Sequence, residues 1–311
     1  MDKKNVLSIK NLNKIYSKKS DKPIHAINNL NLDVQEGEIF GLLGPNGAGK
    51  TTFINILAGT VIKTSGKVNV WGFDLDNNPR QVRASIGIVP QEVNLDPFFT
   101  PRKLLELQAG LYGVKKKDRI TDAILKLVSL EDHANSYARS LSGGMKRRLL
   151  IAKSLFHQPP IIILDEPTAG VDVEIRQSMW LYLKQLNKEG VTIILTTHYL
   201  EEAERLCKNL AIIHKGKIVQ YSSMDKIFEM RKTHTYILKT LEPAREEAVI
   251  NNFRLIKVDK YTYEATISDG ISVTDIIEKL KSININVVSI TNKRNILEEL
   301  FLEITKEKTS L

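Results

Sequence analysis

Residues 44–52 place glycine, lysine and threonine at the spacing of a phosphate-binding loop. They fit the pattern G-x-x-x-x-G-K-[ST] and read Gly44, Pro45, Asn46, Gly47, Ala48, Gly49, Lys50, Thr51 and Thr52. The glycines let backbone N–H groups approach phosphate oxygens, Lys50 offers charge to the β- and γ-phosphates, and the Thr51 hydroxyl can ligate Mg²⁺. The loop predicts binding of a nucleoside triphosphate and leaves GTPases, kinases, helicases and motor ATPases open. The alternative is a Gly-rich turn of no consequence.

Two carboxylates end a second apolar run. Residues 161–164 are Ile-Ile-Ile-Leu, and Asp165 and Glu166 follow directly. At a strand end beside the phosphate loop, Asp165 is placed to hold Mg²⁺ through water, and Glu166 to orient or deprotonate the attacking water. The alternative, a solvated acidic turn, is disfavoured by the loop upstream.

A histidine ends a third apolar run, residues 192–196. His198 can bond a γ-phosphate there and support the water. A lone histidine is more often structural, so the residues alone leave both readings open. We expect the other five histidines to be incidental: His25, His133, His157, His214 and His234.

The segment 141–145, Leu-Ser-Gly-Gly-Met, reads as another helix start. Ser142 can cap the helix, and Gly143 and Gly144 expose backbone N–H groups to an anion. Ser142 lies 23 residues before Asp165. In this order and spacing the segment resembles the signature loop of ATP-binding cassette (ABC) ATPases, and the resemblance covers roughly residues 5–225.

The resemblance implies roles for further residues. Tyr16 resembles the aromatic residue that stacks on adenine, with a core-packing tyrosine as the alternative. Gln91 resembles the glutamine that touches Mg²⁺ and signals to a membrane partner. Residues 169–172 resemble the loop that carries Asp172 across a dimer, and His198 matches the switch histidine.

Two departures from the commoner pattern point to one branch of the family. Met145 stands where glutamine is commoner, and residues 169–172 read Ala-Gly-Val-Asp instead of Ser-Ala-Leu-Asp. Both resemble the drug, antibiotic and polysaccharide exporters of bacteria. This implies a dimer with a second copy or a similar ATPase, two ATP molecules held between phosphate loop and signature loop, and a separate membrane-spanning permease. The tail 297–301 resembles the accessory domain of these ATPases.

Composition fits a cytosolic protein, peripheral on the inner face of the membrane. Among 311 residues there is one cysteine, Cys207, which we expect in the core, and the start lacks the apolar segment of a signal peptide. The net charge of +9 favours an anionic partner and keeps a rival open, an ABC ATPase acting on nucleic acid or ribosomes. Against it, the chain holds one cassette, and one cysteine cannot build a zinc cluster. We expect no nucleic acid partner. A purely regulatory ATP-binding module is the other rival.

These residues require an α/β core to position them. Apolar runs that alternate with helical segments predict strands at 6–9, 39–43, 67–70, 86–89, 161–164, 192–196, 210–213 and 217–220. Helical spacing without strands predicts a helical insert at about 92–140. The expected organisation is a nucleotide-binding domain at 1–225, a linker helix at 226–233 and a small α+β domain at 234–311, with helices at 273–281 and 296–304.

Overall fold

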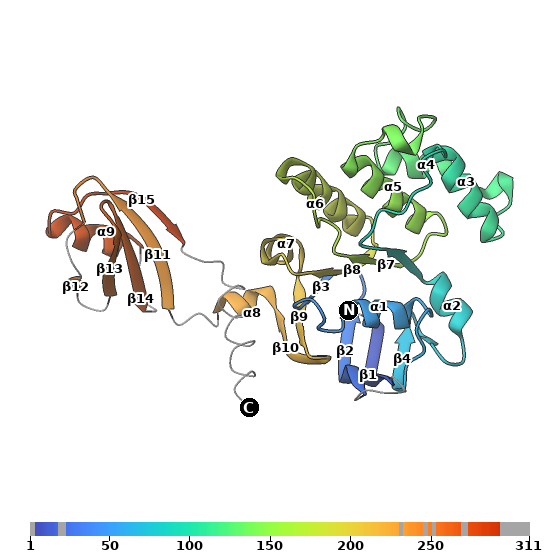
Figure 1. Cartoon of the computed structure of the whole chain (residues 1–311), viewed down its shortest axis with the longest axis horizontal. Helices are drawn as coiled ribbons and strands as arrows, with labels where there is room; N and C mark the ends of the chain where they lie inside the picture. The colour runs from blue at the N-terminus through green and yellow to red at the C-terminus, as the bar shows by residue number, and fades with distance from the viewer. Residues whose placement is uncertain are drawn as a thin grey trace. The chain divides into compact units, whose positions relative to one another are not determined.

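The chain forms two compact units, Met1–Met224 and Asp225–Leu311. Their structure is a computed structural model that describes residues 4–17, 23–229, 233–244, 248–250, 253–268 and 273–292. Figure 1 shows the first unit in blue to yellow and the second in orange to red.

A mixed, largely parallel sheet forms the centre of the first unit. Its order is β10-β9-β3-β8-β7-β6. The strands β3, β6, β7, β8 and β9 run parallel, and β10 pairs antiparallel with β9. Their bounds are β3 Ile39–Leu43, β6 Ile86–Val89, β7 Ile161–Asp165, β8 Thr192–Thr197, β9 Asn209–His214 and β10 Lys217–Ser223. Every residue of β3, β7 and β8 is buried, as an apolar run covered on both faces predicts. The predicted α/β core is confirmed.

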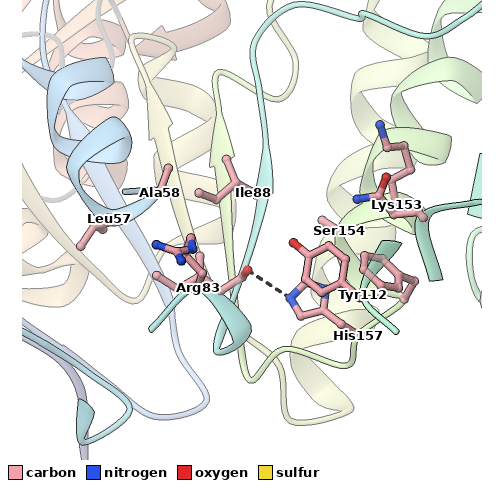
Figure 2. Close-up of a pocket in the computed structure, with 11 residues that line it drawn as sticks. Leu57, Ala58, Arg83, Ile88, Tyr112, Lys153, Ser154 and His157 are labelled. Atoms are coloured by element: carbon pink, nitrogen blue, oxygen red, sulfur yellow. Dashed lines mark hydrogen bonds between the residues drawn. The ribbon is translucent and has the colours of Figure 1, made fainter. Parts of the chain in front are cut away.

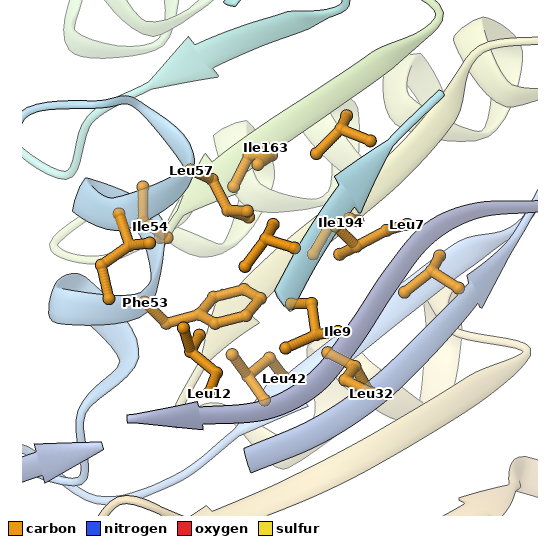
Figure 3. Packing of buried hydrophobic residues seen from close by; sticks show 14 of the residues in the cluster. Leu7, Ile9, Leu12, Leu32, Leu42, Phe53, Ile54, Leu57, Ile163 and Ile194 are labelled. Atoms are coloured by element: carbon orange, nitrogen blue, oxygen red, sulfur yellow. The ribbon is translucent and has the colours of Figure 1, made fainter. Parts of the chain in front are cut away.

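An antiparallel sheet, β2-β1-β4-β5, packs against this core. Its strands are β1 Asn5–Tyr16, β2 Ile24–Gln35, β4 Ser65–Val70 and β5 Phe73–Asp74. Strand β2 is absent from our predictions, although Ile27, Leu30, Leu32 and Val34 are buried within it at mostly alternating positions. Figure 3 shows how Phe53 and Leu57 pack among side chains of both sheets. This apolar layer anchors the helix that follows the phosphate loop.

The helices of the first unit fall into two sets. Those around the sheet are α1 Lys50–Leu57, α2 Pro79–Ala84, α6 Val173–Lys188 and α7 Leu200–Leu206; those of the helical part are α3 Pro101–Leu111, α4 Thr121–Leu127 and α5 Gly143–Leu155, with short turns η1 Lys116–Asp118 and η2 Ala138–Ser140. Thr100 caps α3 by accepting from Lys103 N, and Pro101 sets its first turn. Leu105, Leu125 and Leu149 share one apolar cluster, so α5 packs with the helical insert although it lies beyond residue 140.

The second unit begins within α8 Met224–Glu229 and holds a five-stranded antiparallel sheet and a further described helix. The order is β12-β13-β14-β11-β15, with β11 Thr233–Thr240, β12 Ala248–Ile250, β13 Phe253–Asp259, β14 Thr262–Ser268, β15 Val287–Asn292 and α9 Val273–Ser282. Ile276 and Leu280 of α9 pack on Leu238 and Tyr263 of the sheet. The helix expected at 296–304 and the tail 297–301 lie outside the described residues.

Candidate nucleotide-binding and hydrolysis site

The carboxyl ends of four parallel strands deliver the expected site residues to one edge of the sheet. Strand β3 leads into the phosphate loop, β7 ends at Asp165, β8 is followed by His198, and β6 is followed by Gln91. A pocket of about 360 Å³ opens at this edge. Its lining comes from Ile24, His25, Ala26, Pro45, Asn46, Gly47, Gly49, Lys50, Thr51, Thr52, Gln91, Glu166 and Lys215.

The phosphate loop needs its glycines for two reasons. Gly49 has a φ of +110°, and a Cβ there would lie 2.4 Å from the carbonyl oxygen of Ala26. A Cβ at Gly44 would lie 2.5 Å from the carbonyl oxygen of Ile213. The loop is thus fitted against two neighbouring strands and follows a path that side chains would block. Lys50 is buried, and its Nζ donates to the carbonyl oxygens of Gly44 at 2.7 Å and Pro45 at 3.3 Å.

Glu166 is the point where the predicted hydrolytic residues meet. Its Oε1 lies 3.6 Å from Lys50 Nζ and 3.1 Å from His198 Nδ1. Its Oε2 accepts a hydrogen bond of 3.0 Å from Gln91 Nε2. The residue is buried and has a φ of +47°, a left-handed backbone that costs free energy in a non-glycine residue. This strained turn aims the carboxylate at the phosphate loop.

Asp165 lies directly behind Glu166 and is fixed by Thr196. The Thr196 hydroxyl donates to Asp165 Oδ1 at 2.5 Å and accepts from Glu166 N at 3.2 Å. Asp165, Glu166 and Thr196 are all buried. One hydroxyl therefore aligns the two consecutive carboxylates, a role that the sequence analysis did not assign to Thr196.

Tyr16 stands beside the pocket. It ends β1 and pairs in the sheet with Ile24, which belongs to the lining. Tyr16 is 38% exposed, and Lys14 Nζ lies 4.6 Å from the centre of its ring. This cation–ring contact holds Lys14 against the Tyr16 ring.

The signature loop takes no part in this pocket: none of the described residues that line it comes from 141–145. Ser142 caps α5, as expected, by accepting from Met145 N at 3.2 Å. A Cβ at Gly144 would lie 2.5 Å from Cγ2 of Ile175, whereas a Cβ at Gly143 would meet nothing within 4 Å. Gly144 is therefore required by the packing of α5 on α6, and Gly143 leaves the helix start open.

Three further residues contact Glu166 or line the pocket, and the sequence analysis did not single them out for a role. Arg147 of α5 is buried and donates to the carbonyl oxygens of Pro90 at 2.7 Å and Glu166 at 3.1 Å. Burial lowers its pKa, with partial compensation from Glu202 and Asp165. Lys215 lines the pocket, and so does His25, which we expected to be incidental. Arg147 stands between Lys146 and Arg148 in the sequence and carries no signal of its own, so all three residues follow only from the fold.

Comparisons with known proteins agree with this geometry. The family model described as ABC transporter matches residues 27–169. The linearmycin resistance ATP-binding protein LnrL of Bacillus subtilis is 33% identical, over 96% of this chain and 98% of that protein. The Nod factor export ATP-binding protein I of Cupriavidus pinatubonensis is 43% identical, over 61% of this chain and 59% of that protein.

Solved structures show the same fold. A dimeric ATP-binding cassette in a post-hydrolysis state with ADP and phosphate superposes with a TM-score of 0.61 at 29% identity, over 70% of this chain and 98% of that one. The cbiO1 protein of Clostridium perfringens, part of the ABC transporter complex cbiONQ, gives 0.64 at 28% identity, over 74% of this chain and 92% of that one. The chain therefore belongs to the ABC transporter ATP-binding proteins and is an ATP-hydrolysing subunit of such a transporter.

Proposed function

We propose that this chain powers export of a cargo through a separate permease, and that each of its ATP sites is completed by a second ATPase subunit. The observation that carries the proposal is that Glu166 gathers Lys50, His198 and Gln91 while the signature loop takes no part in lining the pocket. A dimeric cassette is among the similar structures, and relatives named for linearmycin resistance and Nod factor export support the outward direction.

Hydrolysis follows from the contacts of Glu166. Its carboxylate orients or deprotonates the attacking water, and the nearby imidazole of His198 bonds the γ-phosphate. Lys50 balances charge that develops on the phosphoryl oxygens. The N-terminus of α5 in the second subunit, at Ser142 and Gly143, supplies backbone N–H groups to the same phosphate.

The oxygen donors near the loop suit Mg²⁺. The Thr51 hydroxyl and the Gln91 amide line the pocket, and the Asp165 carboxylate is held behind them. Hard oxygen ligands with retained water are what this ion prefers. We propose Thr51, Gln91 and Asp165 as its holders, the aspartate through water; when bound, the ion neutralises phosphate charge.

A cavity of about 220 Å³ is the proposed seat of the permease. It lies between the core and the helical part, lined by Leu57, Ala58, Arg83, Ile86, Ile88, Gln108, Tyr112, Lys153, Ser154, Phe156 and His157 (Figure 2). The rings of Tyr112 and His157 stack at 4.9 Å, and His157 Nε2 lies 3.2 Å from the Ile86 carbonyl oxygen. Strand β6 runs from this wall directly towards Gln91. The described lining holds two cations, Arg83 and Lys153, and no carboxylate, so the occupant should be an apolar permease segment with acidic residues.

Charge reversal tests this seat. We expect Arg83→Glu with Lys153→Glu to abolish co-purification with the permease while ATP binding at the phosphate loop persists. An acidic-to-basic change in the permease segment should restore capture. Unchanged co-purification would contradict the assignment.

Membrane association also belongs to the proposal. No helix among the described residues is long and apolar enough to cross a bilayer. We propose a cytoplasmic chain, peripheral on the inner face of the membrane through its permease. A salt-dependent shift of RNA or DNA at nanomolar protein would instead favour the nucleic-acid alternative.

Two substitutions test the catalytic assignment. Glu166→Gln keeps the shape of the side chain but removes the base, so we expect an ATP-stabilised dimer with little turnover, measured by light scattering and phosphate release. Lys50→Ala should abolish tight ATP binding, measured with a fluorescent nucleotide. Full turnover in the first variant or unaltered affinity in the second would refute the site.

A further inference from the structure

A series of contacts runs from the loop 169–172 to His198 through two residues that have no role so far. Arg176, in the first turns of α6, donates from Nη2 to the Val171 carbonyl oxygen at 3.3 Å. Its guanidinium carbon lies 4.9 Å from the centre of the Tyr199 ring. The Tyr199 ring in turn lies 4.2 Å from the His198 ring at an angle of 35°. The series ends at the catalytic carboxylate, because His198 Nδ1 is 3.1 Å from Glu166 Oε1.

A buried carboxyl group braces the same segments. Glu202 of α7 has no exposed surface, and its Oε1 accepts from Thr168 Oγ1 at 2.9 Å and Trp180 Nε1 at 3.3 Å. Thr168 precedes the loop 169–172, and Trp180 lies on the same helix as Arg176. The loop, α6 and the start of α7 are thus tied together, so that displacement of the loop is passed on rather than absorbed.

Arginine is suited to this place in a way that lysine is not. A planar guanidinium can donate to a carbonyl oxygen at its edge and stack on an aromatic ring with its face. Arg176 Nε is buried without a hydrogen-bond partner among the described residues. Its orientation is therefore set by the Val171 carbonyl, the Tyr199 ring and the attraction of the Glu202 carboxyl group. An arginine that only stabilised the start of α6 would need only one of these contacts.

We propose that Arg176 is a positioning residue for ATP hydrolysis, which carries the position of the dimer-facing loop through Tyr199 to the imidazole of His198. The inference rests on the proposed function, in which that loop meets the second subunit. Arrival of the partner at residues 169–172 would then orient His198 in the same subunit. Hydrolysis would wait for the dimer even though Glu166, Lys50 and His198 already belong to one chain.

Steady-state ATPase assays on the full chain with its permease test the relay. We expect Arg176→Leu to lower kcat about tenfold, because small misplacement of a catalytic group is costly, and to change KM for ATP less than about twofold. The His198→Ala variant should be slower still, and adding Arg176→Leu to it should cost nothing further. Independent, multiplying losses would overturn the relay, as would wild-type kcat in Arg176→Leu.

Matched variants separate positioning from stability. Arg205 makes a similar cation–ring contact, 5.3 Å from the Trp180 ring, on the exposed side of α7. Arg205→Leu should therefore leave kcat unchanged. Tyr199→Phe keeps the ring and should keep kcat within about twofold, whereas Tyr199→Leu should match Arg176→Leu. Equal losses in Tyr199→Phe and Tyr199→Leu would exclude ring stacking as the link.

Imidazole carbon–proton NMR gives a readout that does not depend on turnover. The His198 signal is assigned by its loss in His198→Ala, and Arg176→Leu should move it while leaving in place the signal of His133, a half-buried residue in a turn of the helical part. An unmoved His198 signal refutes the relay. Failure of the proposed function looks different: the wild type itself would then show no ATPase activity with its permease.

Discussion

Replacing Gly144 with alanine separates two reasons for a glycine in the signature loop: packing on α6, or access for the nucleotide of the other subunit. A Cβ at Gly144 lies 2.5 Å from Cγ2 of Ile175, where ordinary contact begins at 3.4 Å. Ile175 is β-branched and helical, so it has one strongly preferred rotamer and its methyl group cannot swing away. The starts of α5 and α6 must therefore separate by about 0.9 Å.

The expected cost is modest in stability and larger in activity. Overpacking of this kind costs about 1–3 kcal/mol, and replacing glycine by alanine in a helix returns up to about 1 kcal/mol. We expect a net loss of about 1 kcal/mol, which lowers the melting temperature by about 2–4 °C in a unit of this size. ATPase activity should fall further, because in the proposed dimer the shift moves the helix start that would meet the partner's nucleotide.

Calorimetry and phosphate-release assays, done in the wild-type chain and in an Ile175→Ala chain, decide between packing on α6 and nucleotide access as the reason for Gly144. In an Ile175→Ala chain, which lacks the obstructing methyl group, Gly144→Ala should no longer destabilise and should leave ATPase activity at the level of Ile175→Ala alone. Gly143→Ala, with open space around it, should raise the melting temperature slightly. An undiminished ATPase loss from Gly144→Ala in the Ile175→Ala background would refute the packing argument and assign the glycine to nucleotide access.

Three further changes have expected outcomes. Lys215 and Gly216 form a two-residue turn with φ of +47° and +77°, and Lys215 lines the pocket. Lys215→Asn should lower ATP affinity several-fold in a nucleotide titration but leave the melting temperature unchanged, because asparagine favours this backbone conformation. Unchanged affinity would show that Lys215 does not contact the nucleotide. Burial raises the pKa of Glu202 above its ordinary 4.5, so the folded chain holds that proton more tightly than the unfolded chain and stability falls as pH rises from there. Glu202→Gln should therefore gain melting temperature relative to wild type as the pH rises above 4.5, and parallel pH curves would contradict this. Tyr16→Leu should raise KM for ATP by about 2- to 10-fold, whereas Tyr16→Phe should leave KM unchanged. Equal KM values in the two variants would refute stacking of the base on Tyr16.

The sequence determined much of the core because local signals agreed there. The runs at 39–43 and 161–164 lack polar side chains and the run at 192–196 has threonine only at its two ends, which suits strands buried on both faces, and all three are strands. Strand β2 was missed because Asn28, Asn29 and Asn31 interrupt the alternation of its apolar residues. The helical part was placed by periodicity, but α5 joins it through contacts between side chains far apart in sequence.

The types and order of the site residues were readable from the chain, since a phosphate loop, two carboxylates and a glycine pair each have a local signature. Their mutual geometry was not. Only the parallel register of β3, β8, β7 and β6 brings Lys50, Glu166, His198 and Gln91 to one edge of the sheet. Arg147, Thr196, Lys215 and Arg176 gain their roles from tertiary neighbours alone, because a hydrogen bond or ring contact across distant segments leaves no periodic trace in sequence. The sequence thus determined the chemistry, and the tertiary structure decided which residues position it.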